Sequence, residues 1–122
     1  MAAVDTAMRK AARDGKGRSR KSATTHNAAA GLDSTLLLLA LAIEYLAFVR
    51  AMRGDHRRAA ALEGYADAGF QRHGYKRDAP ETTMHERIIA LLRQRLTPHE
   101  RERLTAEGAA LTPDAAVALA LE

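Results

Sequence analysis

The sequence from Gly54 to Ala59, Gly-Asp-His-Arg-Arg-Ala, constrains the fold more than any other part of the chain, because it separates two helical patterns with almost no loop between them. Gly54 suits the left-handed conformation that is common just past a helix end. Asp55 is a good N-cap for a following helix. So tight a connection predicts two antiparallel helices that pack side by side as a helical hairpin.

The first helix of the hairpin is expected to begin with Asp33 or Ser34 as its cap and to end near Arg53. Its apolar run covers only residues 36–49 and includes Glu44, whereas a membrane-spanning helix needs roughly 20 mostly apolar residues. We therefore interpret it as a helix buried on most of its faces and expect a cytoplasmic protein. Its heaviest apolar face carries Leu37, Leu38, Leu41, Tyr45, Phe48, Val49 and Met52.

The second helix is expected to follow Asp55 and to run to about His73, where Gly74 ends it. Gly64 and Gly69 each cost roughly 1 kcal/mol relative to Ala inside a helix. Their presence predicts that another helix approaches closely at these positions. The apolar residues of this helix recur at steps of three and one, as in a single helical stripe, and are Leu62, Tyr65, Ala66, Gly69, Phe70 and His73.

Shorter capping helices are expected after the hairpin, because three helix-start signals follow it. Residues 78–81 (Asp-Ala-Pro-Glu) combine an N-cap Asp with an early Pro and a Glu at the third helical position. Residues 97–100 (Thr-Pro-His-Glu) repeat that arrangement, and residues 112–114 (Thr-Pro-Asp) start the last helix. No stretch shows sustained alternation of apolar and polar residues, so the sequence predicts an all-α fold.

The positive charge of the chain belongs to its first 30 residues. Seven basic and two acidic residues lie within 1–30, while 12 basic and 13 acidic residues lie in the remainder. Residues 1–30 are therefore expected to form a flexible basic tail that can include a short helix, and residues 31–122 a single helical domain. Candidate nucleic-acid contacts in this tail are Lys16, Arg18, Arg20 and Lys21.

No arrangement of residues indicates catalysis or metal binding. The chain has no Cys, and its three Ser residues lie in or beside the tail without a nucleophile-elbow context. His85-Glu86 begins like a zinc-protease motif, but Ile89 stands where the second His is required. The histidines at positions 26, 56, 73 and 99 have no ligand-like spacing. We therefore expect no catalytic residues, no metal and no cofactor.

Residues 43–66 resemble part of a tetratricopeptide repeat when they are aligned on Ala59. Leu46-Ala47 stands where that motif has Leu-Gly, Gly54 lies at its inter-helix turn, and Ala59 and Ala66 match its two small residues. Arg50 stands at a position that is usually aromatic, and Glu63 at one that is usually bulky. This resemblance and the apolar stripe together predict six residues that pack the two helices of the hairpin: Leu46, Ala47, Gly54, Ala59, Leu62 and Ala66.

Over about residues 36–122 the chain is similar to the last repeat of large bacterial regulators. The similarity is carried by residues 54–60, 64–68 and 74–75, and by the ending at 104–111 and 114–120. In those regulators a DNA-binding or cyclase domain precedes a sensor built of tetratricopeptide-like repeats. The resemblance implies a C-terminal cap of such a sensor, which binds proteins and does not catalyse a reaction.

Two functions are therefore considered. The first is a helical interaction module that associates with itself or with a protein partner; the second is a small nucleic-acid-binding protein that uses the basic tail, by salt-sensitive contact with phosphates. Membrane insertion is not expected. Aromatic side chains at helical spacing usually belong to a core, but four of them are candidates for a partner surface: Tyr45, Phe48, Tyr65 and Phe70.

Overall fold

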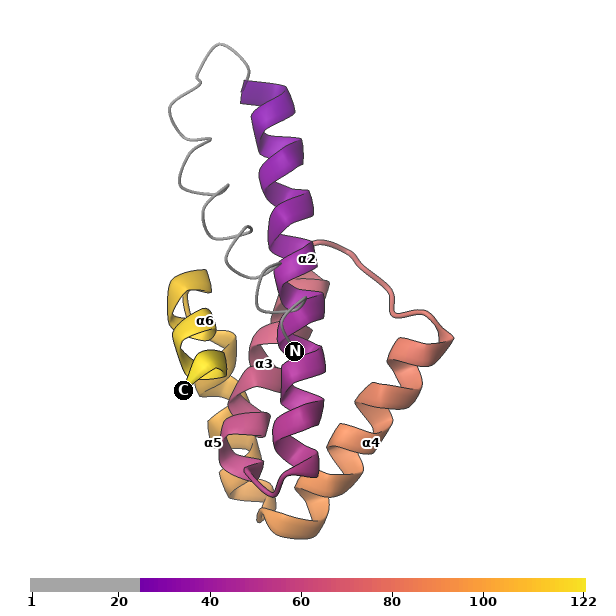
Figure 1. Ribbon diagram of the computed structural model, residues 1–122, viewed down its shortest axis with the longest axis vertical. Coiled ribbons are helices and arrows are strands. Elements are labelled where there is room, and N and C mark those ends of the chain that lie inside the picture. The colour runs from indigo at the N-terminus through magenta and orange to yellow at the C-terminus, as the bar shows by residue number, and fades with distance from the viewer. Residues whose placement is uncertain (1–24) are drawn as a thin grey trace.

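The computed structural model describes residues 25–122, which form five helices and no strand (Figure 1). The predicted all-α fold is confirmed. The predicted tail contacts Lys16, Arg18, Arg20 and Lys21 lie outside the described residues. The helices are α2 (Thr25–Met52), α3 (His56–Arg72), α4 (Ala79–Arg95), α5 (Pro98–Ala109) and α6 (Pro113–Leu121).

The hairpin of α2 and α3 forms as predicted, and the two helices run antiparallel along each other (Figure 1). Gly54 has a φ of 89°, in the left-handed region that a side chain would oppose. The Asp55 N–H donates to the Arg50 carbonyl, and its side chain accepts from the N–H of Arg58 as the N-cap of α3. Gly74, with a φ of 63°, follows α3 at its other end.

The first helix begins earlier than the sequence indicated. It starts at Thr25 rather than after a cap at Asp33 or Ser34, so the predicted boundary between residues 30 and 31 falls inside a helix. The physical reason is that the alanines at 28–30 favour helix. Asp33 and Ser34 lie exposed within α2, and the Thr35 hydroxyl donates to the Gly31 carbonyl one turn back, which is a helix-interior bond.

The face of α2 that packs inward is not the one with the largest apolar side chains. Leu38, Tyr45 and Met52, all on the predicted heavy face, are among the exposed large hydrophobic residues. Because α2 is apolar nearly all round, its composition does not identify the inward face. Small side chains determine which face turns inward, because they let α3 approach closely. The buried apolar residues of α2 are Leu39, Ala40, Ile43, Leu46, Ala47 and Ala51.

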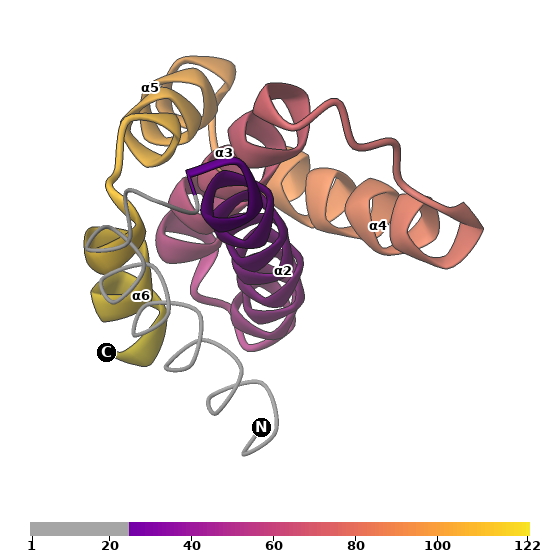
Figure 2. The ribbon, with the colours of Figure 1, turned by 90° about the horizontal axis from the view of Figure 1, so that it is seen from above.

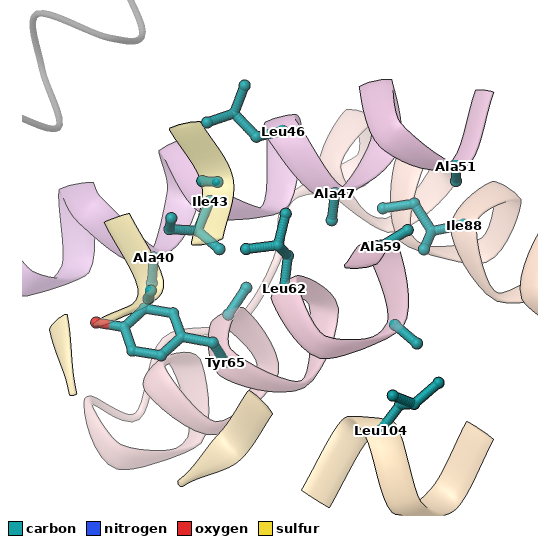
Figure 3. Close-up of a cluster of buried hydrophobic side chains, with 14 of the residues drawn as sticks. Ala40, Ile43, Leu46, Ala47, Ala51, Ala59, Leu62, Tyr65, Ile88 and Leu104 are labelled. Atoms are coloured by element: carbon teal, nitrogen blue, oxygen red, sulfur yellow. The ribbon is translucent and has the colours of Figure 1, made fainter. Parts of the chain in front are cut away.

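The centre of the core lies between α2 and α3. Figure 3 shows Leu62 of α3 pointing toward Ile43 and Ala47 of α2. Ile88 of α4 and Leu104 of α5 close the core from the outside of the hairpin. Of the six residues predicted to pack the hairpin, Gly54 is exposed at the turn. The other five are buried, namely Leu46, Ala47, Ala59, Leu62 and Ala66.

Helix α4 lies on one side of the hairpin, and α5 and α6 lie on the other (Figure 2). Each begins with the predicted cap: Asp78 and Thr97 form capping boxes with Glu81 and Glu100, and Thr112 caps α6. These caps satisfy backbone N–H groups that would otherwise lack a partner.

Close approach of α5 explains the glycine inside α3. A Cβ on Gly64 would overlap the backbone of Thr105 in α5, and a Cβ on Gly108 in α5 would overlap the backbone of Ala61 in α3. The two helices therefore cross in direct backbone contact. The predicted close approach is confirmed at Gly64, and at Gly69 a Cβ would lie 3.1 Å from the Ala40 Cβ.

Within the described residues, one segment is long and apolar enough to cross a membrane by length and composition, Asp33–Met52 of α2. In this fold it packs against α3, α4 and α6, so it occupies the position of a core helix. Glu44, near its middle, is fully buried and paired with Arg77.

Candidate functional site

A buried cluster of charged side chains lies where α2, α3 and α4 meet. Glu44 comes from α2, Glu63 and Asp67 from α3, and His85 from α4. Arg77 comes from the connection between α3 and α4. Among the described residues, Glu44 and Glu63 are the only buried charged side chains in a core that is otherwise apolar. We call these five residues the Glu44–Glu63 cluster.

Arg77 binds three carboxylates of the Glu44–Glu63 cluster. Its Nη2 lies 2.6 Å from Glu44 Oε2, and its Nε lies 3.2 and 3.0 Å from the two oxygens of the same carboxylate. The same Nη2 lies 3.1 Å from Asp67 Oδ1 and 3.4 Å from Glu63 Oε1. The fork of the guanidinium suits such two-pronged contact with a carboxylate. Arg77 thus ties the connection to both helices of the hairpin.

Local structure fixes the position of Arg77. The Tyr75 ring packs against the Phe70 ring with centroids 5.2 Å apart, and the Tyr75 hydroxyl donates to Glu81 Oε1 at 2.6 Å. The Arg77 guanidinium lies over the Phe70 ring, 4.8 Å from its centroid. Asp78, the next residue, caps α4. Three contacts therefore fix the connection between α3 and α4: the Tyr75 ring on Phe70, the Arg77 guanidinium over the same ring, and the Asp78 cap of α4.

The two buried glutamates have opposite protonation behaviour. Burial alone would raise the pKa of Glu44, but the nearby His85 and Glu63 side chains and the hydrogen bonds from Arg77 lower it to about 2. Burial raises the pKa of Glu63 to about 8, and the neighbouring Glu44 adds to this effect. At neutral pH Glu44 is therefore ionised and Glu63 holds a proton.

His85 contacts both glutamates through one ring nitrogen. Its Nδ1 lies 3.5 Å from Glu63 Oε1 and 3.7 Å from Glu44 Oε2. The nearby carboxylates of Glu44 and Glu63 raise the pKa of His85 to about 9, although burial opposes this. The imidazole is charged at neutral pH, so the ionised Glu44 has a cation on either side, Arg77 and His85.

The chemistry open to the Glu44–Glu63 cluster follows from its donor atoms. It can hold protons, join three helices through ion pairs, or offer two carboxylates and an imidazole to a cation. It contains no hydroxyl or thiol side chain.

Sequence reasoning missed the Glu44–Glu63 cluster. Three of its members, Glu44, Glu63 and His85, are 19 and 22 positions apart and lie on three different helices, so no local spacing motif joins them. The one available signal was charge inside apolar patterns: Glu44 interrupts the apolar run of α2, and Glu63 stands at a bulky position of the repeat motif. His85 was noticed, but only next to Glu86, which is exposed.

The four aromatic residues predicted as a partner surface do not share a surface. Tyr65 and Phe70 are buried, and that part of the prediction is wrong, because both side chains fill the core. Tyr45 is 42% exposed, and Phe48 is half-buried beside the Arg87 guanidinium, 5.6 Å from its ring centroid. Only the two aromatic residues of α2 reach the outside.

A second candidate site is the outward face of α2. Its most exposed side chains are Leu38 at 48%, Tyr45 at 42% and Met52 at 53%, which recur every seven residues and so lie on one line along the helix. Half-buried Leu41 and Phe48 fill the intervals. We call these five residues the outer stripe.

Arg50, which stands where the repeat motif has an aromatic residue, has a structural role. Its Nη2 donates to the carbonyl of Ala120 at 3.0 Å, which ties the end of α2 to the end of α6.

Comparisons of this chain with protein-family models, with curated proteins and with solved structures found no match. Function must therefore be argued from the Glu44–Glu63 cluster and the outer stripe themselves.

Proposed function

We propose that this chain is a non-catalytic helical interaction module, of the kind that ends a tetratricopeptide-type sensor of a bacterial transcriptional or signalling regulator, and that it acts in the cytoplasm. The outer stripe carries this proposal. Monomeric proteins seldom leave a continuous row of large apolar side chains exposed, and such rows mark contact surfaces. The hairpin below it, held by small residues and Arg77, supplies a rigid support.

The spacing of the outer stripe favours a helical partner. Steps of three and four residues place side chains along one line of a helix, where they interdigitate with the side chains of another helix lying alongside. In an array of helical repeats, that neighbour is the adjoining repeat. For this chain alone, a second copy can supply it by pairing α2 against α2.

The expected strength of this pairing is modest. Fully burying a large apolar side chain contributes roughly 1.5–3 kcal/mol, so covering the exposed half of Leu38, Tyr45 and Met52 contributes about 1 kcal/mol each. A symmetric pair doubles this to roughly 6 kcal/mol, which must exceed an association cost of at least about 4 kcal/mol. We therefore expect a weak dimer whose population depends on concentration.

Sedimentation equilibrium over a wide range of concentration tests the proposal. Wild-type protein should change from monomer to dimer, and Tyr45→Glu should remain a monomer because it places a charge in the middle of the outer stripe. Leu121→Glu is a matched control, since Leu121 is 45% exposed but lies on α6. A wild-type monomer at every concentration, or equal effects of the two substitutions, would overturn the assignment of the outer stripe.

A further inference from the structure

Two buried polar atoms of the Glu44–Glu63 cluster have no hydrogen-bond partner among the described residues. They are Glu63 Oε2 and His85 Nδ1. Buried polar atoms are nearly always paired, because an unpaired one loses its bond to water without compensation. The Glu63 side chain is only 2% exposed, so bulk water does not supply the missing bond. Both atoms can donate a lone pair to a cation when they carry no proton.

The donor groups already have nearly the separation that a metal ion requires. Glu44, Glu63 and His85 can each offer one ligand atom, and these atoms all lie within 4.8 Å of one another. The imidazole nitrogen is 3.5 and 3.7 Å from the nearer carboxylate oxygens. Tetrahedral zinc with bonds of about 2.0–2.1 Å separates its ligands by about 3.4 Å. The imidazole nitrogen already lies near this separation from each carboxylate. The widest pair of ligand atoms, at most 4.8 Å apart, must close by up to about 1.4 Å, which a change of side-chain torsion allows.

The charges of the Glu44–Glu63 cluster also fit a divalent ion. The ion must displace the protons that Glu63 and His85 hold at neutral pH, as metal binding to protonated ligands generally does. Glu44, Glu63 and Asp67 then carry three negative charges, and Arg77 supplies one positive charge. With a neutral imidazole, two negative charges remain, which one divalent cation neutralises. Arg77 does not have to leave, because each carboxylate oxygen has two lone-pair directions and can accept a hydrogen bond while it binds a metal.

We propose that Glu44, Glu63 and His85 form a binding site for a divalent transition-metal ion, with Zn²⁺ the best match. Two carboxylates and one imidazole are a donor set that zinc accepts, whereas Ca²⁺ and Mg²⁺ prefer six or more oxygens. A water molecule or a partner's side chain completes the fourth position. His85, which is 26% exposed, lies at the outer edge of the site and gives the ion a route of entry.

The ion would join the three helices of the site. Glu44, Glu63 and His85 belong to α2, α3 and α4. The bound ion therefore adds a direct link between the hairpin and α4 to the contacts that Arg77 and His85 already make with the two glutamates. An ion that binds only the folded state stabilises it by an amount that grows with the logarithm of the free-ion concentration above Kd. Zinc is therefore expected to raise the melting temperature of the chain.

The test uses the full chain, freed of metal by a chelator and titrated with ZnCl₂ in a calorimeter. We expect one Zn²⁺ per chain and a rise in melting temperature, with MgCl₂ giving neither. Glu63→Gln and His85→Asn should weaken zinc binding by at least about tenfold. Glu86→Gln and His99→Asn are matched controls, because both residues are exposed and lie outside the cluster, and they should bind as wild type does.

A second measurement requires no variant to fold. Long-range ¹H–¹⁵N spectra of the wild-type chain report each imidazole, and zinc should shift the ring nitrogens of one histidine well before the other four. The proposal is overturned if wild type binds no zinc at one equivalent, if several histidines shift together, or if folded Glu63→Gln binds as tightly as wild type.

Discussion

Replacing Gly64 by Ala should destabilise the protein although Ala favours helix. Inside α3 the change gains about 1 kcal/mol of helix propensity. The new Cβ, however, would overlap the carbonyl of Thr105, which is backbone and cannot rotate away. Restoring carbon contacts to about 3.5 Å requires α5 to move by roughly 1 Å. Such a movement also opens the contact between Gly108 and Ala61 and exposes more of Leu104.

The size of the effect follows from these terms. Overpacking of a tight contact costs about 1–3 kcal/mol and occasionally more, and partial exposure of Leu104 adds about 1 kcal/mol. After the gain in helix propensity, we expect Gly64→Ala to lose roughly 2 kcal/mol of unfolding free energy. For a domain of this size 1 kcal/mol corresponds to about 4–8 °C, so the melting temperature should fall by roughly 10 °C.

Urea denaturation and thermal melting followed by circular dichroism measure this, with Gly69→Ala as the matched control. Gly69 lies on the same helix, but its new Cβ would meet only the Ala40 Cβ, at 3.1 Å, which can give way by a small amount. We expect Gly69→Ala to stay within about 1 kcal/mol of wild type, because propensity offsets the tight contact. Equal stability of the two variants would refute the backbone contact between α3 and α5.

Three further predictions concern charge and caps. Arg77→Ala should cost roughly 3 kcal/mol in a urea titration, because it leaves Glu44 buried without its main partner. Without divalent ions the melting temperature should fall as pH rises toward 9. His85 loses its stabilising charge between its ordinary pKa of 6.5 and its folded pKa of about 9. Glu63 adds to the loss between its ordinary pKa of 4.5 and its folded pKa of about 8, because folding must retain a proton that the unfolded chain has already released. The double variant Glu63→Gln, His85→Asn should flatten this slope, and an unchanged slope would contradict the assignment. Thr97→Ala should cost about 1 kcal/mol by circular-dichroism melting, since it removes a side-chain cap, and no loss would show the cap to be dispensable.

Local chemistry made most of the fold predictable. The turn at Gly54 and the caps at Asp78, Thr97 and Thr112 each depend on residues within one helical turn, so the sequence contains all the information needed to place them. The start of α2 is where this reasoning failed. Asp33 is a good cap residue, but a cap forms only where the chain before it leaves the helix, and the alanines before Asp33 continue it.

The candidate sites depend on which helix faces meet, and this is a long-range property. Nothing near Glu63 in the sequence indicates that Arg77 and His85 lie beside it, because the contact requires α4 to fold back along the hairpin. The sequence likewise did not predict which face of α2 packs inward. A helix that is apolar on every side has no preferred orientation until small residues such as Ala47 let a neighbour approach.

Helix α2 contributes to both candidate sites. It supplies Glu44 to the Glu44–Glu63 cluster and all five residues of the outer stripe. Length and hydropathy alone make residues 33–52 similar to a membrane span. Glu44 separates the alternatives, because a carboxylate facing lipid would lack the Arg77 pairing that the folded hairpin provides. The buried charge of Glu44 on the inward side of α2 therefore favours the folded hairpin over a position in the membrane. On the opposite side, the described residues leave Leu38, Tyr45 and Met52 of the outer stripe exposed. A helix from a second copy has the spacing to cover them.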